Sequence, residues 1–316
     1  MRYMFLIQPM HIMKQVTRSF LYLFIIFSFT VFSISSCNAA GDFPKEITSV
    51  SDTLRVATYN IRLQTTADKG NRAWTNRKKD VAQLIYQNSF DIFGVQEIGS
   101  MAQENDLKAL LPAYDFVSKG RDDSQGKTGE RLGIFFNKKR FSMEMSGFFF
   151  LSETPSVAGK GWDAALNRIC LWVMMKDLVT NTEFFVFNVH FDHLGVTARA
   201  KSAELVVSKM NALAGNLPVI VLGDMNANLS ETAVHSTFTT AMSDSRIISQ
   251  QPSTGPTGTF NNWAVTADNV NASERIDYIY VKNIRVCTYS VLTDRFTDSN
   301  FPSDHFPVMI RCELGN

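Results

Sequence analysis

Residues 218–224, PVIVLGD, combine an apolar run with a terminal aspartate, and the interpretation of the surrounding chain starts from them. Four consecutive aliphatic residues are typical of a strand that is buried on both faces. Such a strand delivers Asp224 to its carboxyl end, where open sheets place their ligands. A turn or helix-cap role is the structural alternative for this aspartate.

Nine further segments show strand patterns, either apolar or alternating between apolar and polar residues. They are LRVATYNI (54–61), DIFGVQEI (91–98), RLGIFFN (131–137), GFFFL (147–151), RICLWVMMK (168–176), EFFVFNVHF (183–191), RIDYIYVK (275–282), RVCTYSVLT (285–293) and HFPVMIRC (305–312). Helical periodicity is present at about 75–89, about 101–111 and 197–215. Many short strands with few helices do not form a doubly wound parallel sheet. They predict an α/β fold in which two mixed sheets pack face to face with helices outside.

Six of the predicted strand termini carry Asn, Asp, Glu or His. These residues are Asn60, Glu97, His190, Asp192, Asp224, Asn226, Asp277, Asp304 and His305. Each residue alone has an ordinary interpretation as a turn or cap. The set as a whole, in this order along the chain, indicates a functional site at the ends of the strands.

The order of these motifs resembles that of the endonuclease/exonuclease/phosphatase superfamily of Mg²⁺-dependent phosphoesterases. The resemblance covers about residues 54–312 through TYNIR, GVQE, NVHFDH, GDMNA, RIDYIYV and SDHFPV. The segments GERLGIFF, FFFLSETP and KGWDAALNRICLW are similar to its bacterial secreted subgroup. The resemblance implies the four-layered α/β sandwich of the DNase I-like fold.

The resemblance also implies a metal site. Glu97 would be the principal Mg²⁺ ligand, with Asn60 and Asp304 beside it, and Mn²⁺ is the alternative ion. Oxygen ligands at wide sequence spacing suit Mg²⁺. The His/Cys spacing that is typical of Zn²⁺ is missing from the sequence.

Five residues take catalytic roles by the same resemblance. Asp224 would orient or deprotonate the attacking water, and Asn226 would position the water or the phosphate. His190 and His305 would donate hydrogen bonds to the non-bridging oxygens as charge develops. Asp277 would hold His305 in its tautomer. The family leaves open whether Asp224 or His305 is the base, and we favour Asp224 because a histidine polarised by Asp277 is a better cationic phosphate ligand.

Three further residues are candidate substrate-binding groups: Arg62, Arg168 and His193. Some superfamily members have a second acidic ligand at the position of Arg62, so the arginine predicts one Mg²⁺. Arg62 would contact substrate phosphate or pair with a carboxylate. Arg168 suits bidentate phosphate contact, and the alternative interpretation is a surface ion pair. For His193 the alternative is a capping or turn role. Glu130 and Arg131 are expected to form a rim pair without catalytic meaning.

The first 37 residues read as an export signal. Lys14 and Arg18 precede an uncharged run, residues 19–36, which ends in ISSC at Cys37. This ending resembles the bacterial lipobox and predicts a cell-envelope lipoprotein, on the periplasmic face or the cell surface, and an uncleaved signal anchor is the alternative. Residues 38–52 would be a tether, and residues 53–316 a single domain of the phosphoesterase superfamily.

Charge limits the partners. Three of the 31 basic residues lie in the export signal, which leaves 28 basic residues against 30 acidic ones. This balance does not suit a protein that grips long polyanions. We expect a monomeric hydrolase of a phosphoric mono- or diester, such as a nucleic-acid fragment, a sugar or inositol phosphate, or a lipid headgroup. A sphingomyelinase-type phospholipase, and a non-catalytic envelope binding protein on the same scaffold, are the alternatives.

Overall fold

The computed structural model describes residues 43–44, 46–47, 51–264, 266–296 and 300–315. The predicted export signal with Cys37 lies outside the described residues. So do residues 38–42, 45 and 48–50 of the predicted tether.

One six-stranded sheet, sheet A, has the order β11-β12-β1-β2-β4-β3. β1 and β2 run parallel, and the other neighbouring strands run antiparallel. The strands are β1 (Leu54–Asn60), β2 (Ile92–Ile98), β3 (Tyr114–Gly120), β4 (Arg131–Asn137), β11 (Ile284–Val291) and β12 (Val308–Leu314).

The other six-stranded sheet, sheet B, has the order β5-β6-β7-β8-β10-β9. Here β7 and β8 run parallel, and the remaining pairs are antiparallel. The strands are β5 (Phe141–Phe150), β6 (Ile169–Asp177), β7 (Thr182–His190), β8 (Val219–Asp224), β9 (Ser243–Asp244) and β10 (Asp277–Lys282).

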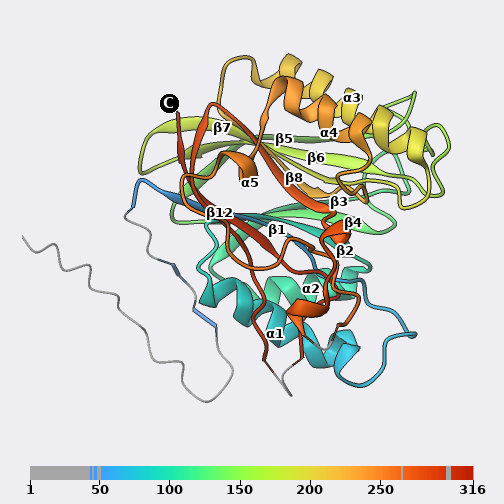
Figure 1. Ribbon diagram of the computed structural model, residues 1–316, viewed down its shortest axis with the longest axis vertical. Coiled ribbons are helices and arrows are strands. Elements are labelled where there is room, and N and C mark those ends of the chain that lie inside the picture. The colour runs from blue at the N-terminus through green and yellow to red at the C-terminus, as the bar shows by residue number, and fades with distance from the viewer. Residues whose placement is uncertain (1–42, 45, 48–50, 265, 297–299, 316) are drawn as a thin grey trace, which may run out of the picture. The chain divides into compact units, whose positions relative to one another are not determined.

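The sheets pack face to face, and helices cover their outer faces (Figure 1). α1 (Trp74–Gln87) and α2 (Met101–Leu110) bury apolar side chains on sheet A, and α3 (Val196–Ala214) and α4 (Thr232–Ala241) on sheet B. Short helices complete the described elements: α5 (Ser245–Ile248), η1 (Gly70–Arg72), η2 (Ala267–Asn269) and η3 (Ala272–Glu274). None of the described helices has the length and apolar composition of a membrane span. This four-layered α/β sandwich confirms the predicted fold.

Side chains alternate between the two faces of each strand, and this alternation positions the polar residues. In β8, Ile220 and Leu222 face the other sheet, whereas Val219 and Val221 face the layer of α3 and α4. By the same alternation, Asp224 belongs to the face between the sheets.

The three predicted helices correspond to α1, α2 and α3, within two residues at each end. The predicted strand at 147–151 corresponds to the end of the longer β5. β5 pairs with β6 from Phe141 onward, and the register shifts at a bulge between Met143 and Met145. β3 and α4 were not predicted. β3 is an edge strand with mostly half-buried side chains, and α4 is rich in Thr and Ser, which are weak helix formers.

Two buried amide side chains join the sheets. Asn188 of β7 donates from Nδ2 to the carbonyl oxygens of Val95 and Gly133 in sheet A, at 3.0 and 2.8 Å. Gln96 of β2 donates from Nε2 to Asn188 Oδ1 at 2.7 Å and to Thr58 Oγ1 at 3.0 Å. Because buried polar groups need partners, these bonds fix how the sheets lie on each other.

Part of the predicted tether contacts the domain. Phe43 stacks on Tyr86 of α1, with ring centroids 5.2 Å apart, and the Tyr86 hydroxyl donates to the carbonyl oxygen of Pro44 at 3.1 Å. Asn137, the last residue of β4, donates from Nδ2 to the carbonyl oxygen of Ile47 at 3.0 Å. These contacts lie at the amino-terminal end of β1 and β2, since Asn137 N bonds the carbonyl oxygen of residue 91.

Candidate active site

Polar residues from both sheets meet at one edge of the sandwich. Asp224, the last residue of β8, lies in register with His190 of β7 and with Asp277 of β10. Asn60 is the last residue of β1 in the facing sheet. All four side chains are buried, so their charges and hydrogen bonds act with little screening by water.

Three nitrogen atoms surround one carboxylate oxygen of Asp224. Asn60 Nδ2 donates to Asp224 Oδ2 at 3.0 Å, and the Nε2 atoms of His190 and His305 lie 3.6 and 3.8 Å from the same oxygen. Burial and the nearby charge of Asp277 raise the pKa of Asp224 above its ordinary value. Asp224 therefore holds a proton more readily than a carboxylate in water, which suits a group that accepts one from an attacking water.

His305 is held as a cation by carboxylates. Its Nδ1 lies 2.9 Å from Asp277 Oδ2. Burial opposes a charge on the imidazole, but the negative charges of Asp277, Asp224 and Asp304 outweigh burial and raise the pKa of His305 to about 10. At neutral pH, His305 is therefore an imidazolium whose Nε2 faces Asp224.

Glu97 enters the site through an irregularity in β2. Strict alternation would turn its side chain toward the helices, but its φ is 63° and the pairing with β4 shifts between Val95 and Ile98. Glu97 Oε1 accepts from Asn60 Nδ2 at 3.0 Å, and Oε2 accepts from the backbone N–H of Leu63 at 3.0 Å. The bulge therefore brings this carboxylate back to the end of β1.

Asp304 lies on the loop before β12, beside the same strand end. Ser303 Oγ donates to the carbonyl oxygen of Asn60 at 2.8 Å and ties this loop to β1. Burial raises the pKa of Asp304, and the negative charge of Glu97 raises it further. Carboxylate oxygens are hard donors whose negative charge a divalent cation would offset, so Glu97 and Asp304 fit the metal that was predicted.

Arg62 and Asn60 refine the predicted ligand set. Arg62 Nε donates to Asp68 Oδ2 at 3.1 Å, and its Nη1 lies 3.6 Å from Asp304 Oδ2, so Arg62 pairs with carboxylates. Asn60 Oδ1 accepts from the backbone N–H of Arg62 at 3.0 Å. The amide nitrogen of Asn60 therefore faces the carboxylates, while its oxygen faces the Arg62 backbone.

A second histidine–carboxylate pair lies on the other side of Asp224. His190 Nδ1 lies 3.3 Å from Glu130 Oε1 without forming a hydrogen bond, and Glu130 Oε1 accepts from Arg121 Nη1 at 2.7 Å. Buried Arg168 lies close by, with Nη1 3.8 Å from Glu130 Oε1. Burial and the Arg168 charge lower the pKa of His190 to about 3, so its imidazole is neutral at physiological pH.

The expected Glu130–Arg131 rim pair was wrong. Arg131 Nε bonds Glu104 Oε2 at 2.6 Å, whereas Glu130 contacts Arg121 and His190. Adjacent residues of an extended chain point to opposite faces, and this separates the two side chains.

Asp192 organises the loops beside His190. Its carboxylate accepts four backbone N–H bonds, which outweigh burial and hold its pKa below the usual range; the donors are Ala165, Leu166, Leu194 and Gly195. Its Oδ2 also lies 3.5 Å from Arg168 Nε. His193 is exposed at this margin, with Nδ1 3.3 Å from Arg168 Nη2.

Asn226 closes the loop after β8. Its φ is 46°, and its backbone N–H donates to Asp224 Oδ1 at 2.9 Å. Its Nδ2 donates to the carbonyl oxygen of Phe191 at 3.0 Å. Asn226 therefore supports Asp224 through the backbone and fixes its own amide against the β7 end.

The endonuclease/exonuclease/phosphatase family model matches residues 57–305, which contain all of these site residues. The chain belongs to this family. Members of the family hydrolyse phosphoric esters, and the chain is an enzyme of this class.

Solved structures of two family members from Bacteroides thetaiotaomicron are similar. An endonuclease/exonuclease/phosphatase family protein has 38% identity and a TM-score of 0.77, over 84% of this chain and 98% of its own. A mannosyl-6-phosphatase has 39% identity and a TM-score of 0.76, over 83% of this chain and 100% of its own. An uncharacterised protein of Acanthamoeba polyphaga mimivirus is 27% identical over 162 residues, 49% of this chain and 60% of that protein. The chain thus matches less than two thirds of this viral relative.

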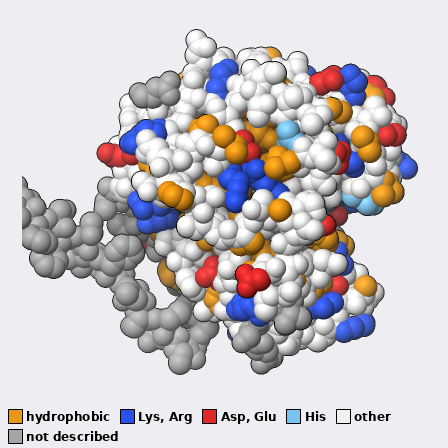
Figure 2. All heavy atoms as spheres, in the orientation of Figure 1, with side chains coloured by type: hydrophobic (Ala, Val, Ile, Leu, Met, Phe, Trp, Pro, Cys, Tyr) orange, Lys and Arg blue, Asp and Glu red, His pale blue; other side chains and the backbone are white. Residues whose placement is uncertain are grey.

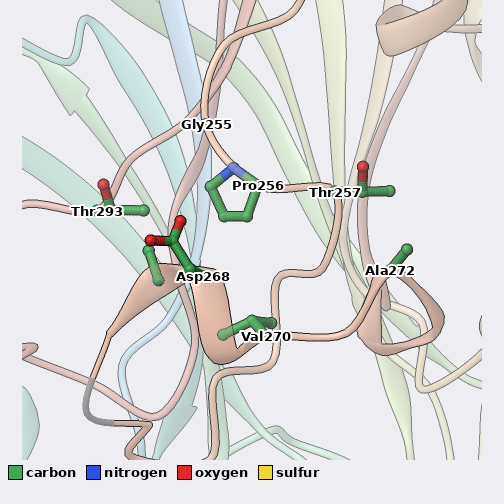
Figure 3. Close-up of a pocket in the computed structure, with 8 residues that line it drawn as sticks. Gly255, Pro256, Thr257, Asp268, Val270, Ala272 and Thr293 are labelled. Atoms are coloured by element: carbon green, nitrogen blue, oxygen red, sulfur yellow. The ribbon is translucent and has the colours of Figure 1, made fainter.

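The face of this family member in Figure 2 carries mixed charge. On the face shown in Figure 2, the described Lys and Arg side chains form small groups among acidic and uncharged ones. A cavity of about 470 Å³ is lined by other residues (Figure 3). Its lining includes Thr257, Asp268 and Thr293, and Asp268 is the only charged residue among the described residues that line it. None of these described lining residues was predicted for the site.

The site of this family member brings most of the predicted residues together. The predicted catalytic and metal residues gather around Asp224 and Glu97, Arg62 joins them through Asp304, and His193 stays at the exposed margin. Glu130 was not predicted as a neighbour of His190, nor Arg121 as the partner of Glu130. The available signal for Glu130 was its place directly before an apolar strand, which it shares with Asp304 and His305.

Proposed function

We propose that this chain is a divalent-metal-dependent phosphatase that transfers the phosphoryl group of a phosphorylated sugar to water. The observation that carries the hydrolytic part is the convergence of Asn60 Nδ2, His190 Nε2 and His305 Nε2 on Asp224 Oδ2. One buried acceptor with several nitrogen groups around it can orient a water and surround a phosphoryl group.

Glu97 and Asp304 would hold the metal, for which Mg²⁺ is our choice because both are carboxylates. Asp224, Asp277 and His305 form another donor set, in which one ligand atom of each residue lies within 4.8 Å of the others. His305 Nδ1, however, is 2.9 Å from Asp277 Oδ2. Because His305 and Asp277 already bond each other, we favour Glu97 and Asp304 as the ligands. When bound, the metal would neutralise negative charge on the phosphate oxygens.

The residues of the chain then have distinct tasks. Asp224 orients the attacking water and accepts its proton as the oxygen–phosphorus bond forms, while the bond to the alcohol oxygen breaks. His305 donates from Nε2 to a phosphoryl oxygen, where negative charge increases. Asp277 keeps that imidazole protonated, and Glu130 lies 3.3 Å from His190 Nδ1. The leaving oxygen takes a proton from solvent and departs as the alcohol, and Asp224 then releases the proton that it accepted to solvent.

The sugar part of the proposal is supported by the similarity to the mannosyl-6-phosphatase, at 39% identity over 83% of this chain. The near balance of charge outside the predicted export signal, 28 basic residues against 30 acidic ones, agrees with a small substrate rather than a long polyanion. We also retain, as a proposal, that the protein is exported and anchored through Cys37.

The test is hydrolysis by the purified protein of a substrate panel, with Mg²⁺, Mn²⁺ or a chelator. The panel contains mannose 6-phosphate, glucose 6-phosphate, inositol phosphate, bis-p-nitrophenyl phosphate, a DNA oligonucleotide and sphingomyelin vesicles. We expect chelator-sensitive phosphate release from the hexose phosphates. Asp224→Asn should lower kcat by at least 10²-fold, as loss of a positioned base does.

Asp268→Asn is the matched control, because Asp268 lies in the separate cavity of Figure 3. Its kcat should equal that of the wild type. Cleavage of the diesters or of sphingomyelin alone would overturn the sugar-phosphate proposal in favour of a nuclease or phospholipase. Activity that survives the chelator would overturn the metal dependence. Activity that survives Asp224→Asn would overturn the role of Asp224 as the base. Binding of a phosphoester with no turnover would indicate the non-catalytic scaffold.

A further inference from the structure

Arg77 of α1 is a fully buried arginine that bonds backbone carbonyl groups. Its Nη1 donates to the carbonyl oxygens of Ile61 and Pro302, the second at 3.2 Å. Its Nη2 donates to the carbonyl oxygen of Arg62 at 2.6 Å, and its Nε to that of Arg72 at 2.9 Å. The side chain is 1% exposed.

The environment of Arg77 is unusual for a buried charge. Within the described part of the chain, Arg77 makes no ion pair with a carboxylate, although a buried guanidinium is usually paired. The rings of Trp74 and Trp263 flank the guanidinium, with its central carbon 5.1 and 5.7 Å from the ring centroids. Four of its N–H groups donate to carbonyl oxygens instead.

Three of these four carbonyl groups lie beside the proposed metal ligands: two follow the end of β1, where Asn60 bonds Glu97, and one is on the loop that carries Asp304. Ile61 and Arg62 directly follow Asn60 at the end of β1, and Pro302 precedes Asp304 by two residues. The Arg62 backbone is held in the left-handed region, with a φ of 58°, which costs free energy unless its neighbours hold it. One planar guanidinium therefore joins the β1 end to the Asp304 loop and stabilises a strained turn between them.

We propose that Arg77 is a positioning residue for the metal site: it sets the separation between the β1 end, where Asn60 holds Glu97, and the loop that carries Asp304. The inference rests on the proposed metal site. Lysine could keep the charge, but its single ammonium group lacks the fork that reaches carbonyl groups of two segments at once. Groups behind metal ligands commonly change metal affinity 10- to 100-fold when they are altered.

The experiment compares the wild type with Arg77→Lys by calorimetric titration of the metal-free protein with Mn²⁺ or Mg²⁺, and by urea unfolding. We expect Arg77→Lys to raise the metal Kd at least about tenfold. We also expect a larger loss in kcat/KM at low metal concentration than at saturating metal, which loss of stability alone would not produce.

Arg140→Lys is the matched control. Arg140 is also 1% exposed, but it pairs with Asp177 and donates to the carbonyl oxygen of Thr53, before the opposite end of β1. Its replacement should lower stability and leave the metal Kd unchanged. If Arg77→Lys does not fold, Arg77→Gln, which keeps one donor group, takes its place in the same titration.

The outcomes separate the two proposals. A wild-type protein that binds no divalent metal would overturn the proposed function itself. A wild type that binds metal, with an Arg77 variant that is less stable but has the same Kd, would overturn only the role of Arg77. An equal rise in Kd for Arg140→Lys would also overturn it, because the effect would then follow from lost stability.

Discussion

Among the carboxylates that keep His305 charged, Asp277 has the largest effect and bonds its Nδ1, and this gives a pH prediction. In Asp277→Asn, the pKa of His305 should fall from about 10 toward or below its ordinary value near 6.5. The kcat/KM of the variant should then decline as the pH rises above about 6.5, whereas His305 should cause no such decline in the wild type below pH 9. Steady-state rates between pH 5.5 and 9 measure this.

The free energy of unfolding should also depend on the protonation of His305. Because the folded-state pKa of His305 is raised, its pairing stabilises the wild type fully below pH 6.5 and loses this contribution as the pH rises through about 10. Urea unfolding of the wild type and Asp277→Asn should therefore converge at high pH. Asp244→Asn is the control, since its partner Arg275 does not titrate in this range. A rate profile for Asp277→Asn that parallels the wild type would contradict the prediction.

Arg62 competes with a metal for Asp304. Its Nη1 lies 3.6 Å from Asp304 Oδ2, so its positive charge repels a cation at the same carboxylate. We expect Arg62→Met to bind Mg²⁺ roughly fivefold more tightly, which corresponds to about 1 kcal/mol of relieved repulsion. Calorimetric titration measures the change. Weaker binding would show that Arg62 instead supports the ligands.

At the level of the strand, the bulge in β2 has a measurable cost. Glu97 has a φ of 63°, which residues with a Cβ adopt only at a cost of about 1 kcal/mol. Glu97→Ala and Glu97→Gly both remove the carboxylate, so their difference reports the backbone alone. We expect Glu97→Gly to be more stable than Glu97→Ala by about 1 kcal/mol in urea unfolding, and both to lose metal binding. Equal stabilities would mean that β2 relaxes without the glutamate.

Elements with strong patterns could be predicted from the sequence, and those with mixed patterns could not. The run before Asp224 is buried on both faces, as its aliphatic residues indicated. β3 escaped prediction because an edge strand is only half covered. Arg77 was missed because a charged residue in a helix suggests a solvated face. Its spacing from buried Trp74 and Val81, by three and four residues, was the available signal.

For the molecule as a whole, the segment before the domain contributes to stability. Phe43 covers Tyr86, and the Ile47 carbonyl oxygen bonds Asn137. A fragment of residues 43–316 should therefore have a Tm a few degrees above that of residues 53–316, as expected for about 1 kcal/mol. Calorimetric scans compare the two, and the variant Phe43→Ala in the longer fragment should lose much of the difference. Identical Tm values would show that residues 43–52 act only as a spacer.

The amide pair between the sheets constrains how relatives of this protein can diverge. Gln96 donates to Asn188, and Asn188 donates to the carbonyl oxygens of Val95 and Gly133, between the two sheets that supply Asn60 and Asp224 to the site. Replacing one amide alone would leave buried groups without partners. Substitutions at positions 96 and 188 should therefore occur together in relatives. The loops at the margin of the site are free of this constraint, so substrate preference can change while the catalytic residues stay the same.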